Sequence, residues 1–131
     1  MTTTLRKTLA IAFAAMFAIV MTACGGSTPE DTEPTGAPPA DATVVTVSAT
    51  EYAFELSTTT IPAGAVSFEL TNNGSMSHDL VLEGGPGGGT EVIGSGQTAT
   101  LNVTLEPGTY TLYCSVGNHR AQGMEIEITV E

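Results

Sequence analysis

The sequence predicts one all-β domain, a sandwich of about seven to eight strands that occupies residues 43–131. Two features of this region support the prediction. Short segments rich in Val, Thr, Ile, Tyr and Phe are separated by Gly, Asn and Pro, which is typical of an antiparallel sandwich. Within several of these segments apolar and polar residues alternate, and no segment has the apolar spacing of a helix. A chain of 131 residues has room for one such core.

Seven strands are predicted in order along the chain. They cover residues 44–49, 52–57, 66–72, 78–83, 98–105, 108–114 and 124–130. The second strand illustrates the alternation, because Tyr52, Phe54 and Leu56 are apolar and the residues between them are small or acidic. One face of such a strand is buried and the other meets water. The glycine-rich segment 84–89 is predicted to be a surface loop.

Residues 1–23 have the layout of an export signal peptide. Arg6 and Lys7 precede an apolar run that is too short to span a bilayer, and small residues follow that run. The tetrad at 21–24, MTAC, resembles a bacterial lipobox, in which the signal is cut before the cysteine and the thiol then carries lipid. We therefore expect Cys24 to anchor the protein to the outer face of the cell membrane. Ordinary cleavage, which would leave a periplasmic or secreted protein, is the alternative.

Residues 24–42 form the predicted link between the lipid-attachment site and the domain. After Cys24 this segment contains Gly, Pro, Thr, Ser, Ala and acidic residues, with no large apolar side chain to bury. Such a composition favours disorder. We therefore expect a disordered tether that holds the domain to its anchor.

From Cys24 onward the chain is strongly acidic. It carries fourteen acidic residues against one basic residue, Arg120, so that its formal net charge is −13. Such a surface repels the phosphates of nucleic acid and attracts basic proteins. The chain has two cysteines, Cys24 and Cys114, and the first is expected to carry lipid, so no disulfide framework is available. We expect a monomer with protein partners, basic ones among them, and no affinity for nucleic acid.

Four residues have side chains suited to a metal site. Cys114, His119 and Met124 are separated by four residues each time and lie on one loop between the last two predicted strands. A thiolate, an imidazole and a thioether together suit copper, because Cu(I) favours sulfur ligands and Cu(II) is well served by nitrogen. His78, the chain's other histidine, offers a second imidazole. Zinc is the competing metal, although a thioether is a poor zinc ligand. Taken singly, each residue has a plainer interpretation in packing or at the surface.

Two motifs contain these residues, N-x-G-x-x-x-H at 72–78 and C-x4-H-x4-M at 114–124. In these motifs the chain resembles the plastocyanin and azurin family of small cupredoxins, over residues 44–131. The resemblance implies a Greek-key sandwich that holds one type 1, or blue, copper ion. It also implies that His78, Cys114 and His119 are the equatorial ligands and that Met124 is the weak axial ligand.

The resemblance also implies roles for neighbouring residues. In the family, the residue after the first histidine ligand hydrogen-bonds to the loop that bears the cysteine. Here that residue is Asp79, which we expect to accept from the Ser115 hydroxyl or from backbone N–H groups. Electrons usually enter the family's site through the exposed edge of the C-terminal histidine, His119, among apolar side chains. The candidates for that apolar surround are Met76, Pro86, Val116 and Ala121. We expect Arg120 beside it to pair with a local carboxylate.

The function expected from the resemblance is the transfer of single electrons between redox proteins outside the cytoplasm. Catalysis is not expected, because no histidine remains for the second copper centre of a copper enzyme. A copper chaperone or copper store on the same fold is the main alternative. Chaperone sites often use several methionines, and beyond the leader only Met76 and Met124 remain. A third interpretation is an immunoglobulin-like binding module in which the ligand-like residues coincide by chance.

Overall fold

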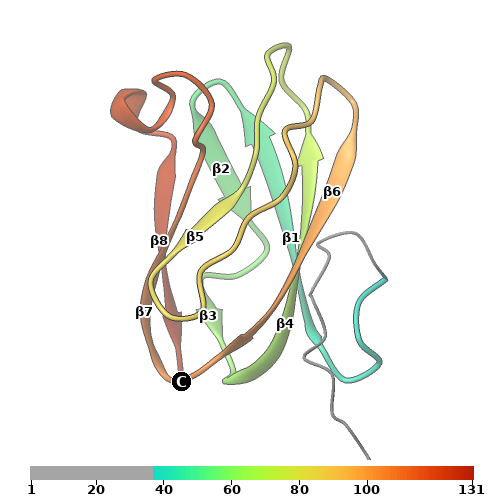
Figure 1. Ribbon diagram of the computed structural model, residues 1–131, viewed down its shortest axis with the longest axis vertical. Coiled ribbons are helices and arrows are strands. Elements are labelled where there is room, and N and C mark those ends of the chain that lie inside the picture. The colour runs from blue at the N-terminus through green and yellow to red at the C-terminus, as the bar shows by residue number, and fades with distance from the viewer. Residues whose placement is uncertain (1–36) are drawn as a thin grey trace, which may run out of the picture. The chain divides into compact units, whose positions relative to one another are not determined.

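Eight strands and one short 3-10 helix make up residues 37–131, which are the residues that the computed structural model describes (Figure 1). In chain order they are β1 (Thr43–Thr50), β2 (Ala53–Leu56), β3 (Thr60–Ile61), β4 (Gly64–Asn72), β5 (Val81–Glu83), β6 (Thr98–Leu105), β7 (Gly108–Tyr113), η1 (Arg120–Gln122) and β8 (Glu125–Val130). The prediction of an all-β domain is therefore confirmed. The predictions for the signal peptide, for Cys24 and for the tether up to residue 36 lie outside the described residues.

The strands form two four-stranded sheets with the orders β2-β1-β4-β6 and β3-β8-β7-β5. Strands that are distant in sequence become neighbours, as the crossing connections of a Greek-key sandwich require. The antiparallel pairing typical of such a pattern holds for four of the six strand pairs, whereas β1 pairs with β4 and β3 with β8 in parallel. Alternation along a strand reports which face is buried and carries no information on the direction of the neighbouring strand.

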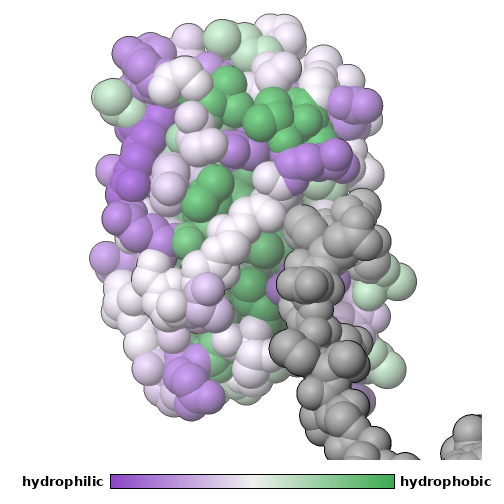
Figure 2. All heavy atoms as spheres, viewed as in Figure 1, coloured by the Kyte–Doolittle hydropathy of each residue, from purple (hydrophilic) through white to green (hydrophobic). Residues whose placement is uncertain are grey.

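Alternating apolar side chains of both sheets fill the core. Val45, Val47 and Ala49 point inward from β1, and β4 contributes Phe68, which is fully buried. β4 lies between β1 and β6, so it has no free edge. Side chains stacked between two sheets in this way lose their contact with water, which is the main force that stabilises the domain. Figure 2 shows patches of apolar residues at the surface on this face, with polar residues and a pale strip of chain beside them.

The predicted strand at 78–83 is shorter than expected. Only Val81–Glu83 pairs with β7, whereas His78 and Leu80 bond to residues of the following loop. His78 exchanges backbone hydrogen bonds with Ile93, and Leu80 donates to the Thr90 hydroxyl oxygen. The segment 78–80 is thus paired with the loop that follows β5.

Two further elements had no counterpart in the prediction. β3 has two residues and η1 has three. Segments of this length are too short to show a period of 2 or of 3.6 residues.

Candidate metal centre

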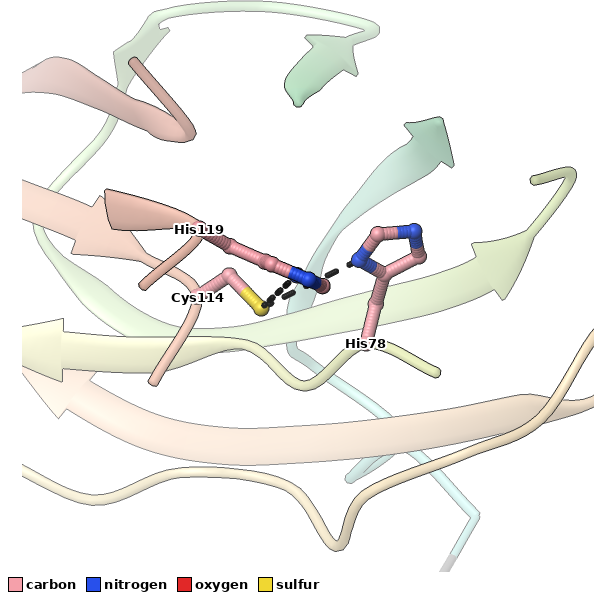
Figure 3. A group of neighbouring side chains, drawn as sticks. All are labelled: His78, Cys114 and His119. Atoms are coloured by element: carbon pink, nitrogen blue, oxygen red, sulfur yellow. Dashed lines mark hydrogen bonds between the residues drawn. The ribbon is translucent and has the colours of Figure 1, made fainter. Parts of the chain in front are cut away.

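Three of the four predicted ligand side chains converge in the interior. The Sγ atom of Cys114 lies 3.9 Å from Nδ1 of His78 and 3.5 Å from Nδ1 of His119. All three residues are buried, and one donor atom from each lies within 4.8 Å of the other two. Figure 3 shows the sulfur facing the nearer nitrogen of both rings. A thiol and two imidazoles that meet in this way form a donor set with room for one ion.

The C-terminal loop is closed by its own backbone hydrogen bonds. Cys114 donates its N–H to the carbonyl of Met124 at 3.1 Å, and Met124 donates to the carbonyl of His119, also at 3.1 Å. Gly123 takes a φ of 103°, a left-handed conformation that favours glycine, and this turn ends η1. The backbone of Met124 is therefore bonded to both neighbouring ligand residues, and its side chain is fully buried.

The buried amide of Asn72 positions the loop that leads to His78. Its Nδ2 donates to the carbonyl of Met76 at 2.8 Å and to that of Ile93 at 3.1 Å, and its Oδ1 accepts from the N–H of Gly74 at 2.9 Å. Since Ile93 is also bridged to His78, one side chain fixes both segments around this imidazole. The first residue of the N-x-G-x-x-x-H motif is thus explained by three hydrogen bonds to the backbone.

Asp79 joins the two segments that carry the ligands. Its Oδ1 accepts from the backbone N–H of Ser115 at 2.7 Å, and its Oδ2 accepts from the Ser115 hydroxyl. The resemblance implies a bond from the Ser115 hydroxyl or from backbone N–H groups, and the structure contains one of each kind. Because Asp79 follows His78 and Ser115 follows Cys114, this pair of bonds fixes the distance between the two ligand residues.

Burial favours the neutral forms of His78 and Cys114. Burial, followed by the nearby His119, lowers the pKa of His78 below its ordinary value. Burial also raises the pKa of the Cys114 thiol. An imidazole and a thiol are the neutral forms of these groups, so a cation must displace the thiol proton when it binds.

His119 is less accessible than the resemblance implied. It is 4% exposed, compared with 0% for His78, because other side chains cover it. The ring of Tyr52 packs edge-on against the His119 ring at 5.1 Å between centroids, and the Tyr52 hydroxyl lies 3.7 Å from Sδ of Met76. Met76 therefore lies in this region, as expected, and is itself 42% exposed.

Two of the other expected neighbours of His119 lie on its loop, and the third lies elsewhere. Val116 accepts a backbone hydrogen bond from His119, and Ala121 is exposed on η1. The expectation for Pro86 is wrong, since it lines a hollow together with Leu101 and Val103 of β6. β5 leads the chain away from the site before Pro86, and Figure 1 shows the following loop near the end of the sheet where β7 begins.

Arg120 pairs with carboxylates, as expected. Its Nε donates to Glu125 at 2.9 Å, and one of its terminal nitrogens is paired with Glu83. The guanidinium also lies over the ring of Tyr113, 4.2 Å from its centroid. These contacts hold the side chain against β5, β7 and β8, beside the ligand loop.

Sequence reasoning missed Glu51 as part of this region. Its Oε1 lies 3.8 Å from Nε2 of His78 and accepts from the backbone N–H groups of Ser75 and Met76. The Met76 hydrogen bond is the main reason that the pKa of Glu51 falls to about 2. No local pattern links Glu51 to the histidine motif, so only the tertiary structure reveals the contact.

Comparison with known proteins agrees with this fold. The family of cupredoxin-like domains matches residues 9–128. A dithionite-reduced auracyanin from Roseiflexus castenholzii superposes with a TM-score of 0.60 and 22% identity, over 69% of this chain and 98% of that one. Auracyanin B gives a TM-score of 0.58 and 21% identity, over 74% of this chain and 96% of the other.

A third solved structure has the same fold. Auracyanin A, a blue copper protein from Chloroflexus aurantiacus, gives a TM-score of 0.54 and 20% identity, over 68% of this chain and 100% of that one. At these identities the three likenesses concern the fold, whereas the family match covers most of the sequence. The chain belongs to the family of cupredoxin-like domains.

Proposed function

We propose that the protein is a type 1 copper protein that carries single electrons between redox proteins outside the cytoplasm. One observation carries the proposal: a buried cysteine sulfur lies 3.9 Å and 3.5 Å from the Nδ1 atoms of two buried histidines. Bound copper supplies a one-electron couple in such a site, since sulfur suits Cu(I) and nitrogen suits Cu(II). The donor set fits this ion better than zinc, whose structural sites are closed by Cys, His or carboxylate ligands.

The residues of the site have separate tasks. His78, Cys114 and His119 would hold the ion through two imidazoles and a thiolate, and Met124 would offer its thioether as a weaker donor. The Cys114 thiol gives up its proton on binding, which makes loading favourable at higher pH. The Asp79 and Asn72 hydrogen bonds keep the segments in place when the charge of the site changes. A fixed donor set of this kind lets an electron arrive or leave with little movement of the protein.

The electron route that we propose runs through His119. It retains 4% exposure while His78 has none, so it is the imidazole nearer to solvent. Tyr52 covers part of its ring, and the exposed Met76 adjoins Tyr52. A partner that docks over these side chains would approach the site through the imidazole that keeps some exposure. The acidic surface of the chain would favour a basic partner.

Export of the protein is supported by its N-terminal sequence. Residues 1–23 read as a signal peptide, and Cys24 is the lipid-attachment site that we propose for anchoring it to the outer face of the membrane. None of the helices within residues 37–131 has the length and apolar character to cross a bilayer. We propose that the domain acts as a monomer on its tether.

The decisive test is the visible spectrum of the purified protein titrated with Cu(II). We expect an intense blue thiolate-to-copper charge-transfer band at one equivalent, and we expect Cys114→Ser to lose it while keeping the fold. A colourless wild-type complex would refute the proposal, and stronger competition by zinc would redirect it to a zinc site. Voltammetry separates electron transfer, which gives a fast reversible couple, from copper delivery, which gives slow or irreversible cycling.

A further inference from the structure

We propose that the Glu51 carboxylate is the charged partner of the imidazole of His78 and lowers the reduction potential of the site. The inference rests on the copper site proposed above and concerns a residue outside the ligand set. The observation behind it is a buried nitrogen that lacks a hydrogen bond. Nε2 of His78 is buried and has no hydrogen-bond partner within residues 37–131. A histidine that binds a metal through Nδ1 carries its proton on Nε2, and that N–H is almost always directed at an acceptor such as a carboxylate.

Glu51 is the carboxylate that faces this nitrogen. The distance from its Oε1 to Nε2 of His78 is 3.8 Å, longer than a direct hydrogen bond and short enough for attraction between the N–H dipole and a full negative charge. The side chain of His78 is 0% exposed, and that of Glu51 is 29% exposed. Water therefore reaches the carboxylate and screens part of its charge, but water does not reach the imidazole.

Backbone hydrogen bonds hold the carboxylate at this place. Oε1 of Glu51 accepts from the N–H of Ser75 at 2.5 Å and from the N–H of Met76 at 2.7 Å. The Ser75 hydroxyl adds a third contact at 3.3 Å. These residues form the loop that leads into His78. An acceptor fixed by two N–H groups keeps its distance from the imidazole without relying on the metal.

The fold explains why Glu51 reaches this loop. β1 runs parallel to β4, and the register places Ala49 opposite Asn72. Glu51 comes one residue after the end of β1 and Gly74 two residues after the end of β4, and Asn73 donates its N–H to the carbonyl of Ala49 at 2.9 Å. The parallel pairing of β1 with β4 therefore places Glu51 beside the loop that leads into His78.

Gly74 provides the space that the carboxylate occupies. A Cβ atom at this position would lie 2.6 Å from Oε1 of Glu51, closer than atoms in contact can come. Gly74 is not among the glycines with positive φ, so its backbone conformation does not demand glycine. The glycine of the N-x-G-x-x-x-H motif is therefore explained here by the approach of Glu51.

A fixed negative charge beside a ligand favours Cu(II) over Cu(I) and lowers the reduction potential. If Glu51 only clamped the loop, its charge would be irrelevant, and a neutral side chain of the same shape would serve equally. Glu51→Gln distinguishes these roles, because glutamine keeps the shape and one acceptor oxygen. Glu55→Gln is the matched control, since it removes the same charge from an exposed position on β2.

The test is voltammetry of the copper-loaded variants at one pH and ionic strength. We expect Glu51→Gln to retain the blue band and to shift the potential upward, and Glu55→Gln to stay close to wild type. Gly74→Ala, which displaces the carboxylate, should shift the potential in the same direction and add little in the Glu51→Gln background. Equal potentials for wild type, Glu51→Gln and Glu55→Gln would overturn the inference.

A second readout needs no metal. Nitrogen-15 NMR of the metal-free protein identifies which ring nitrogen of His78 carries the proton. We expect the Nε2–H tautomer in the wild-type protein and a lower share of it in Glu51→Ala, with Glu55→Ala unchanged. An unchanged tautomer share in Glu51→Ala would overturn the inference. If the wild-type protein fails to form a blue complex, the proposed function fails, and this measurement still decides the pairing of Glu51 with His78.

Discussion

Removal of the Asp79 carboxylate should destabilise the protein, because the hydrogen bonds between the two ligand-bearing segments are lost. Asp79→Ala deletes two hydrogen bonds, one from the Ser115 N–H at 2.7 Å and one from the Ser115 hydroxyl. Hydrogen bonds to a charged group contribute roughly 1.5–3 kcal/mol each. Ser115 is exposed, so water replaces part of what is lost, and we expect a decrease of about 2–3 kcal/mol in the free energy of unfolding.

Urea unfolding of the metal-free protein measures this loss. With a urea dependence of about 1.5 kcal/mol per M, the midpoint should fall by about 1.3–2 M. Ser115→Ala removes only the hydroxyl bond and should cost about 1 kcal/mol in the wild-type protein. In the Asp79→Ala background the same change should cost close to nothing. The reasoning is refuted if Asp79→Ala unfolds at the wild-type midpoint, or if Ser115→Ala costs the same in both backgrounds.

Three further predictions concern the axial ligand, the pH dependence and the core. Met124→Leu should keep the blue band and raise the potential, because a donor to Cu(II) is lost; loss of colour would contradict the axial assignment. The lowered pKa of His78 means that, as the pH falls through its ordinary value of 6.5, the unfolded chain binds a proton that the folded, metal-free protein binds only at lower pH. Stability should therefore fall as the pH drops from 7 toward 5, by at most about 1.4 kcal/mol per pH unit. Urea midpoints check this, with His78→Gln as the control that flattens the slope; a midpoint that rises on acidification would exclude it. Phe68→Ala should cost about 3–5 kcal/mol in urea unfolding, whereas Val44→Ala on the exposed side of β1 should cost under about 1 kcal/mol; equal costs would contradict the assignment of the core.

Spacing along the chain predicted some of the residues of the site and not others. Cys114, His119 and Met124 lie on one loop, so their spacing alone indicated that they could meet. His78 was included because it is the remaining histidine and fits a family motif. The pairing of Asp79 with Ser115 followed from the same resemblance. The expectation for Pro86 was wrong because it assumed that the loop after β5 returns to the site, and nothing in the local sequence gives the direction of that loop.

The sequence by itself determined the β character of the domain and the identity of its donor atoms. Alternation of apolar and polar residues is a local property, and so is the chemistry of a thiol or an imidazole. Only the tertiary structure decided which distant atoms meet. The parallel pairing of β1 with β4 carries Glu51 to the loop before His78, and Gly74 leaves the space for it. Strand direction and register depend on contacts across the whole core, so no short segment of the chain specifies them.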